Sequence, residues 1–295
     1  MTSQLPPTAL PRITIVTPAT AHDEYLEATI RSVVCQDYFN LEYIVIDDGT
    51  SSDRRRIRQK YELELRWQNC PPGTELCAAL NLAFAKSSGE IMGWLEPGDL
   101  MHTNGLYVIG SIFALFQNVE WITARPFNFS PNGLPAGIKH LERWTRMRFL
   151  AGGNKYIHRD TTFWRRSLWE RAGGSLATEF GLASEFELFV RFFRHALLYS
   201  VDALIGGYRT HPGNHSASGS HRRYNQICDQ IADRELAGIK GAYAAKLFRT
   251  MTRIVLHIPG VRRIWHKFAV QSIYRCPGRD WPPKIRARRD EWSFE

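Results

Sequence analysis

The chain has 295 residues, of which 44% are apolar and 12% are aromatic. This composition allows a substantial core and excludes an intrinsically disordered chain. The net charge of +9 is unevenly distributed: positions 240–289 hold thirteen Lys and Arg against one acid, Asp280, whereas the remainder is mildly acidic. The sequence therefore predicts a mildly acidic globular part followed by a basic tail.

The five cysteines are odd in number and irregularly spaced, so they indicate neither a disulfide framework nor a zinc site. The start of the chain lacks the basic stretch and apolar run of a secretory signal. No uncharged apolar stretch reaches about 18 residues, the length that spans a bilayer. We therefore expect a cytoplasmic location.

Short apolar strands alternate with amphipathic helices in the first half of the chain. In order, the pattern predicts a strand at 13–17, a helix at 22–36, a strand at 41–46, a helix at 51–61, a strand at 65–68, a helix at 75–86, a strand at 90–95 and a helix at 106–116. This succession is typical of an α/β fold with a mostly parallel sheet sandwiched by helices. Later the pattern predicts a loop at 128–137, a helix at 184–195, helical stretches in the basic tail and poor order in the last fifteen residues.

Acidic turns follow two of the predicted strands. Asp47 and Asp48 follow the second strand, and Glu96 and Asp99 follow the fourth. Asp, Gly and Pro are also ordinary turn residues, so each turn has a purely structural interpretation. Ligands of open α/β sheets bind beyond the carboxyl ends of the strands, where both turns fall. The first turn could hold a ribose or a base, and the second could bind Mg²⁺ or Mn²⁺ through carboxylate oxygens.

Six segments, in order over residues 12–218, resemble family 2 glycosyltransferases of the GT-A fold. They begin at Ile13, Gln36, Gly89, Thr162, Ser184 and Tyr208, and they read ITIVTP, QDYFNLEYIVIDDG, GEIMGWL, TFWRRSLWERAGG, SEFEL and YRTHP. The resemblance implies an inverting transferase that moves a sugar from a nucleotide-diphosphate sugar to a hydroxyl acceptor. We expect a GT-A-like domain at 12–220 and a helical basic tail at 221–295.

The resemblance implies a donor nucleotide bordered by Thr17, Pro18 and Asp48. Asp47 is a further candidate for donor binding, and anchoring of the strand end is its alternative role. The resemblance also implies that Asp99, with or without Glu96, holds a divalent cation, Mn²⁺ or Mg²⁺. Such a cation stabilises the charge that grows on the leaving diphosphate. The chain departs from the family pattern at Gly98, where the metal motif has an acid, and at Cys77 and Ala78, where the donor site is often polar.

The resemblance also implies that Glu185 takes the place of the family's catalytic base, which removes the proton of the acceptor hydroxyl. Ser184 and Glu187 have the spacing of a helix capping box, which would leave Glu185 free to point into the site. Asp160 resembles an acidic position of the acceptor pocket. The other expected acceptor or phosphate contacts are Trp164, Arg209 and His211. Burial in the core is the alternative for the tryptophan, and a solvated loop is the alternative for the other two.

Two other functions compete with this reading. A nucleotidyltransferase would carry a glycine-rich, lysine-containing phosphate loop, and the residues after the first strand contain neither glycine nor lysine. A degenerate, non-catalytic domain that binds nucleotide sugars stays open because of Gly98 and Ala78. The expected partners are a nucleotide-sugar donor and a glycan or lipid-linked glycan acceptor, in cell-surface or exopolysaccharide synthesis.

The basic tail interleaves bulky apolar residues with Lys and Arg between about positions 240 and 275. An interfacial helix has this mixture, so we expect the tail to attach the protein peripherally to the anionic inner face of a membrane. A helix packed on the domain, with solvated arginines, is the alternative. Nucleic acid is disfavoured as a partner, because the apolar residues are mostly aliphatic rather than stacking aromatics.

Overall fold

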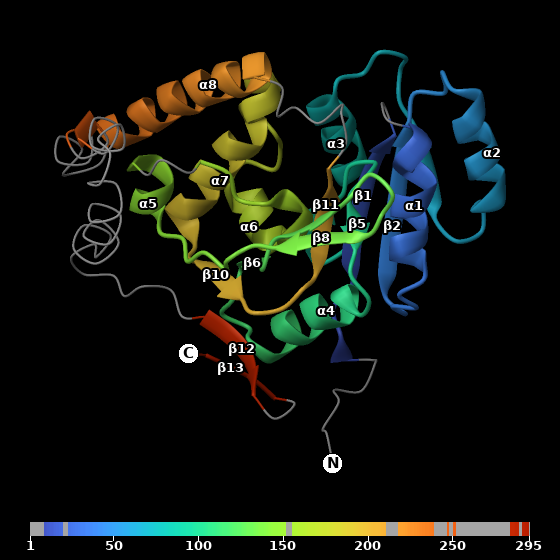
Figure 1. The fold of residues 1–295 in the computed structure, drawn as a ribbon, viewed down its shortest axis with the longest axis horizontal. Helices are drawn as coiled ribbons and strands as arrows, with labels where there is room; N and C mark the ends of the chain where they lie inside the picture. Colours follow the sequence, from blue (N-terminus) through green and yellow to red (C-terminus); the bar gives the residue numbers. More distant parts are fainter. Residues whose placement is uncertain are drawn as a thin grey trace.

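The computed structural model describes residues 9–19, 23–151, 155–210, 218–238, 247, 250–251, 284–288 and 291–294. Its centre is a nine-stranded sheet with helices on both faces (Figure 1). In spatial order its strands are β13 (Glu291–Phe294), β12 (Lys284–Arg288), β10 (Leu198–Val201), β6 (Trp121–Ala124), β9 (Thr162–Arg165), β4 (Ile91–Trp94), β1 (Ile13–Ala19), β2 (Leu41–Asp47) and β3 (Arg66–Asn69).

The mostly parallel sheet expected from the sequence is confirmed. β1 lies between β2 and β4 and runs parallel to both, with Ala19 opposite Asp47 and Val16 opposite Trp94. β3, β6, β10 and β12 also have parallel neighbours, whereas β9 runs antiparallel to β4 and β6, and β13 runs antiparallel to β12. The carboxyl ends of β2 and β4 therefore flank the end of β1 at one edge of the sheet.

Two hydrophobic cores cover the two faces of the sheet, because side chains alternate along each strand. In β1, Ile15 belongs to one core and Val16 to the other. The Ile15 side is covered by α1 (Asp23–Val34), α2 (Ser52–Lys60) and α4 (Gly105–Leu115). The Val16 side is covered by α3 (Leu76–Phe84), α5 (Arg146–Ala151), α6 (Arg166–Arg171), α7 (Ser184–His195) and α8 (Ser218–Ala237).

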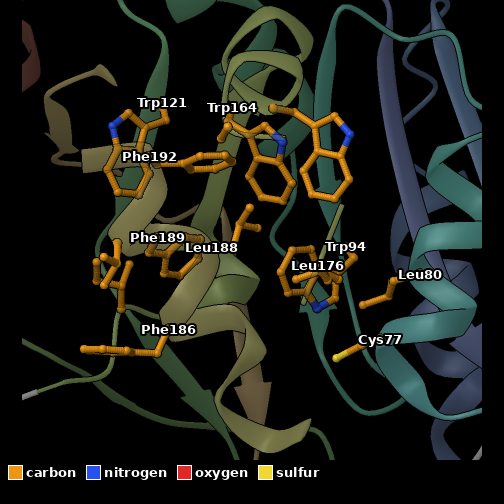
Figure 2. Packing of buried hydrophobic residues seen from close by; sticks show 14 of the residues in the cluster. Cys77, Leu80, Trp94, Trp121, Trp164, Leu176, Phe186, Leu188, Phe189 and Phe192 are labelled. Carbon is orange, nitrogen blue, oxygen red and sulfur yellow. The ribbon is translucent and has the colours of Figure 1, made fainter. Parts of the chain in front are cut away.

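Aromatic side chains dominate the core beneath α7 (Figure 2). The ring of Trp164 in β9 lies 5.4 Å from that of Trp94 and 5.5 Å from that of Phe192, measured between centroids. Trp121 packs against Phe189 and Phe192 in the same layer. Such rings bury large apolar areas, so this layer fixes α7 on the sheet. α8 packs in turn on α5 and α7 (Figure 1).

A smaller, four-stranded sheet lies beside the carboxyl edge of the main one. Its order is β5 (Leu100–Met101), β11 (Gly206–Arg209), β7 (Phe127–Phe129) and β8 (Pro135–Ile138). β5 directly follows the second acidic turn. A Cβ atom at Gly206 would lie 2.2 Å from the carbonyl oxygen of Asp160, so a glycine lets β11 approach the short 3-10 helix η2 (Arg159–Thr161). A second 3-10 helix, η3 (Thr178–Ala183), leads into α7.

The end of the chain differs from the sequence expectation. Poor order was expected there, but β12 and β13 form a hairpin that joins the main sheet beside β10. Ile285 is fully buried, and the Asp202 carboxylate pairs with Arg125, Lys284 and Arg286. Burial acts to raise the pKa of Asp202, but hydrogen bonds from Lys284 and Arg125 lower it to about 2. The strand was missed because its ends are basic and its apolar run is short.

Most of the basic tail, including nearly all of 240–275, lies outside the described residues. The expected membrane attachment of this segment therefore stays a prediction. Within the described part of the chain, no helix combines the length and apolar character needed to cross a membrane.

Candidate active site

The second acidic turn, residues 96–99, is fixed against α1 by hydrogen bonds. The Glu96 N–H donates to Oδ2 of Asp99 over 3.0 Å. The Thr29 hydroxyl donates to the Asp99 carbonyl and accepts from the Gly98 N–H. Gly98 has a φ of 109°, a conformation that favours glycine. These contacts explain why a glycine stands at this position and why Asp99 is only 5% exposed.

A guanidinium from η2 lies among the acids of this turn and of α7. Arg159 approaches Glu96 at 2.9 Å, Glu185 at 3.7 Å and Asp99 at 3.8 Å, measured between nitrogen and oxygen. The start of η2 is held by the hydroxyls of Thr161 and Thr162, which both donate to the carbonyl of His158. Turn, 3-10 helix and α7 thus bring Glu96, Asp99, Asp160 and Glu185 to one place.

Burial and mutual repulsion raise the pKa of two of these acids. Burial raises the pKa of Asp99 well above its ordinary value, and the neighbouring Asp160 and Glu96 add to this against the opposing charge of Arg159. Burial also raises the pKa of Glu185 to about 7, against Arg159 and with Glu96 and Asp160 in support. A carboxylate with a pKa near 7 is suited to accept a proton at neutral pH.

Asp160 is the most deeply buried of the four acids, at 1% exposure. Its Oδ1 lies 3.7 Å from Nδ1 of His158. Its Oδ2 is buried and has no hydrogen-bond partner among the described residues. An unsatisfied buried carboxylate oxygen is costly, which is typical of a group that receives a partner on ligand binding.

The first acidic turn has a different environment. The buried Arg54 places Nη1 at 2.7 Å from both Asp47 and Asp48, and the same nitrogen donates to the carbonyl of Ala19. Asp48 also accepts hydrogen bonds from the N–H and the hydroxyl of Thr50. Burial acts to raise the pKa of Asp48, but the bonds from Thr50 and Arg54 lower it. Asp48 is therefore ionised and internally paired.

The other expected donor residues lie next to this turn. Thr17 and Pro18 are buried near the carboxyl end of β1, and the Thr17 hydroxyl shares a 2.9 Å hydrogen bond with Tyr43. All four expected donor residues thus lie at the ends of β1 and β2, as the sequence predicted. Their contact with a nucleotide stays a prediction.

The expected acceptor residues are dispersed. Trp164 is fully buried in the core of β9, which agrees with its alternative interpretation. Arg209 is buried in β11, where it donates to the carbonyl of Pro131 and lies over the ring of Tyr25. His211 falls outside the described residues. Among the members of the acceptor set that the structure describes, only Asp160 lies in the acidic cluster with Glu185.

The expected capping box at the start of α7 is wrong. Ser184 is the first residue of α7, and its hydroxyl donates to the carbonyls of Ala177 and Gly181 instead of capping the helix. Glu187 accepts from Arg191, one turn further along. The backbone of η3 is non-helical at Gly181, so carbonyls in and before η3 need hydrogen-bond donors. The Ser184 hydroxyl donates to two of them and is therefore not available as a cap. Glu185 still lies at the acidic cluster, with its carboxylate 3.7 Å from the guanidinium of Arg159.

The sequence reasoning missed both arginines that organise the acidic turns. Arg159 stands directly before Asp160, and that adjacency is the only signal the sequence held. Arg54 reads as one of several arginines on a charged helix. Their roles depend on contacts between residues distant in sequence.

The acids around Arg159 suit a divalent cation by their chemistry. They offer only carboxylate oxygens, the ligands of Mg²⁺ and Mn²⁺, and the buried Oδ2 of Asp160 lacks a partner. Within the described ranges, no three His, Cys, Asp or Glu side chains are already arranged around a metal position. Arg159 lies between the acids instead.

The comparisons with known proteins agree with this arrangement. Residues 14–109, which include both acidic turns, match the family described as Glycosyl transferase family 2. Over this third of its length the chain is similar to family 2 glycosyltransferases. The GalNAc(5)-diNAcBac-PP-undecaprenol beta-1,3-glucosyltransferase of Campylobacter jejuni is 27% identical over 106 residues, which are 33% of this chain and 33% of that protein. An uncharacterized glycosyltransferase of Rickettsia bellii is 30% identical over 100 residues, or 33% of this chain and 14% of that protein. The matches therefore span a third or less of these two relatives.

Solved structures extend the likeness in fold to most of the chain. TarS of S. aureus, in complex with UDP-GlcNAc, superposes with a TM-score of 0.63 at 14% identity, over 88% of this chain and 76% of that one. The mannosyltransferase PcManGT from Pyrobaculum calidifontis, in complex with GDP-Man and Mn²⁺, gives 0.51 at 17% identity, over 90% and 85%. At these identities the likeness concerns the fold, and the expected GT-A fold is confirmed.

Proposed function

We propose that this chain is an inverting glycosyltransferase that moves a sugar from a nucleotide-diphosphate sugar to a hydroxyl acceptor. The observation that carries the proposal is the acidic cluster of Glu96, Asp99, Asp160 and Glu185, built where ligands of α/β sheets bind. The donor nucleotide is placed at the ends of β1 and β2, beside Asp48.

Glu185 is the proposed base. Inversion needs the acceptor hydroxyl to attack the sugar directly as the diphosphate leaves, so the protein has to take one proton from that hydroxyl. A partly buried carboxylate with a pKa of about 7 holds such a proton more readily than an exposed glutamate does. Asp160, with its unpartnered oxygen, is the proposed hydrogen-bond acceptor for a second hydroxyl of the same substrate.

Asp99, with Glu96, is the proposed holder of a divalent cation. Mn²⁺ or Mg²⁺ bound there would offset the charge of the leaving diphosphate. The buried, raised-pKa carboxyl of Asp99 fits this role, because a bound cation would keep it ionised. PcManGT, one of the solved structures of this fold, is in complex with Mn²⁺.

For the acceptor, we propose a glycan, or a glycan carried on a lipid, in cell-surface glycan synthesis. The C. jejuni relative is named for an undecaprenol-linked acceptor. The basic segment at 240–275 supports the same class, since peripheral binding to an anionic membrane surface would bring the domain to a lipid-borne substrate.

A non-catalytic binding domain is the second candidate. The observation in its favour is that Gly98 replaces an acid in the metal motif, so Asp99 has fewer acidic neighbours to share a cation with. This candidate predicts donor binding without turnover.

One experiment separates the two candidates. Purified protein is screened with UDP- and GDP-sugars for a rise in melting temperature, with Mn²⁺ and with a chelator, and each stabilising donor is then assayed for hydrolysis. We expect one donor to stabilise the protein in Mn²⁺ and to be slowly hydrolysed. Stabilisation with no hydrolysis, and no transfer to any glycan tested, would favour the binding domain.

A further inference from the structure

Two arginines of the described part of the chain hold a carboxylate in a forked geometry. Arg191 grips Glu187 with Nε and Nη2, at 2.8 to 2.9 Å, and Arg194 grips Glu235 in the same forked manner. This geometry is the strong, specific form of an arginine–carboxylate pair. Both pairs join helices or helical turns, so their role is structural.

Arg159 is held differently. Only its contact with Glu96 is short, at 2.9 Å, whereas Asp99 and Glu185 lie at 3.8 and 3.7 Å. Its Nε is buried and has no hydrogen-bond partner among the described residues. The guanidinium therefore lies among three carboxylates, and it does not form a two-pronged hydrogen-bonded pair with any of them.

The charge balance around Arg159 is also incomplete. Glu96, Asp99 and Glu185 form no ion pair with any other Lys or Arg in the part of the chain that the structure describes. Asp160 adds a fourth carboxylate within the same cluster. In the described part of the chain, one guanidinium thus faces four carboxyl groups, and like charges with little access to water repel each other strongly.

We propose that Arg159 is an internal counter-ion, which holds the place of the divalent cation in the metal-free protein and is displaced from Glu96 when the cation binds. The inference rests on the proposed metal site at Asp99 and Glu96. Arg159 is a positioning residue in this scheme: it keeps the acids together until the cation arrives, and it competes with that cation.

Two opposite effects of removing this charge follow. Without Arg159 the acids repel each other, so the metal-free protein loses stability. The same loss of a positive charge makes the cluster more negative, so Mn²⁺ should bind more tightly, on the order of tenfold or more. A merely structural arginine would give the first effect without the second.

The experiment uses the full-length chain with Mn²⁺ alone as the probe. Mn²⁺ affinity is measured from the electron paramagnetic resonance signal of the free ion, and melting temperature is measured in a chelator and in saturating Mn²⁺. The variants are Arg159→Gln and Arg159→Lys, and Arg191→Gln is the control for a lost structural pair. For Arg159→Gln we expect a lowered melting temperature in chelator, recovery in Mn²⁺, and a Kd for Mn²⁺ reduced about tenfold. Arg159→Lys should remain close to the wild type.

Arg191→Gln should lose the same stability in both media, with an unchanged Kd. The double variant Asp99→Asn/Arg159→Gln should lose the gain in affinity. The inference would be overturned if Arg159→Gln bound Mn²⁺ no more tightly than the wild type, lost the same stability in both media, or failed to fold even in Mn²⁺. It would also be overturned if the gain in affinity persisted in the double variant. Neither donor nor acceptor enters the measurement, so a failure to detect sugar transfer would count against the proposed function alone.

Discussion

The two acidic turns at the carboxyl edge of the sheet have similar sequences and different environments. In the first, Asp47 and Asp48 share one buried guanidinium, that of Arg54, at 2.7 Å each. In the second, Asp99 and Glu96 share Arg159 with Glu185, and only one of the three distances is short. The pKa of Asp48 is lowered, whereas the pKa values of Asp99 and Glu185 are raised.

The difference indicates in which turn the negative charges are already compensated by the protein's own residues. Hydrogen bonds from Arg54 and Thr50 satisfy the acids of the first turn, so their charge is already stabilised by the fold. In the second turn, Asp99 is buried and Glu96 is partly exposed, and the one guanidinium that pairs with both is shared with Glu185. Groups whose pKa values are displaced in this way are typical of catalytic sites. This contrast supports the proposal that the second turn takes part in the chemistry and that the first positions the donor.

Of the substitutions in the two turns, Asp99→Asn should have the largest effect on sugar transfer. It removes the carboxylate proposed to hold the cation, so transfer should fall by about a thousandfold or more, with an unchanged melting temperature in chelator. Asp48→Asn is the matched control: it should raise the donor KM and leave kcat nearly unchanged. Steady-state kinetics of both variants check this. Full activity of Asp99→Asn would remove the second turn from the mechanism.

Glu185→Gln should be nearly as damaging, since a general base contributes about a hundredfold to ten-thousandfold. The loss should lie in kcat, and donor binding measured by calorimetry should be retained. Glu187→Gln, two residues along the same helix, is the control and should keep kcat, because Glu187 pairs with Arg191. The reverse pattern, with the Glu187 variant inactive, would contradict the assignment within α7.

Arg54→Met should test the first turn through stability instead of activity. It leaves Asp47 and Asp48 without a counter-ion in a buried position, and breaking such a pair costs about 3–5 kcal/mol. The exposed neighbour Arg55 supplies the control, since Arg55→Met should change stability by less than about 0.5 kcal/mol. Urea denaturation of both variants measures the difference. Equal effects would mean that the first turn is not held by Arg54.

The pH profile should distinguish the turns more finely. As pH falls below about 7, Glu185 takes up a proton, so kcat/KM should fall about tenfold per pH unit, whereas Asp48 stays ionised. The stability of the fold changes in the opposite direction with pH. The pKa of Glu185 is higher in the folded than in the unfolded chain, so its contribution is full below about 4.5 and is lost as pH rises through 7.

Glu185→Gln should therefore flatten the decline in unfolding free energy between about pH 4.5 and 7. Melting curves of wild type and variant across this range provide the measurement. A decline of the same slope in both proteins would show that another group titrates there.

The smallest expected effect concerns the basic segment at 240–275. Replacing four of its Lys and Arg residues by Gln should weaken sedimentation with anionic vesicles at low salt, at about 1 kcal/mol per charge near the surface. Neutral vesicles and the acidic-turn variants serve as controls, because neither should show salt-sensitive binding differences. Equal sedimentation of wild type and substituted protein would favour a tail packed on the domain.

The sequence predicted the parts of the fold whose signals are local. β1, β2 and β4 are short apolar runs, and their order with α1 to α4 sufficed to place both acidic turns at one edge. It did not predict β9, whose aromatic and arginine residues conceal a fully buried antiparallel strand between β4 and β6. Strands of this kind are defined by partners far away in the chain.

The candidate site, like the fold, was predicted only in part. Asp99, Glu185 and Asp160 were identified from their segments, and the structure brings them together. The arginine between them was not identified, because nothing in a sequence shows which of many arginines turns inward. The supposed cap of Ser184 failed for a related reason: the preceding segment competes for the hydroxyl.

The hairpin at the end of the chain has a practical consequence. β12 covers the edge of β10 (Figure 1), and ion pairs of Asp202 with Lys284 and Arg286 hold it there. A protein shortened before residue 284 would expose the unpaired amides and carbonyls of β10 as an edge strand, a template for association with a second molecule. Truncated proteins should therefore form dimers or aggregates that mimic or mask a change in membrane binding, so the basic segment is better studied by substitution in the intact chain.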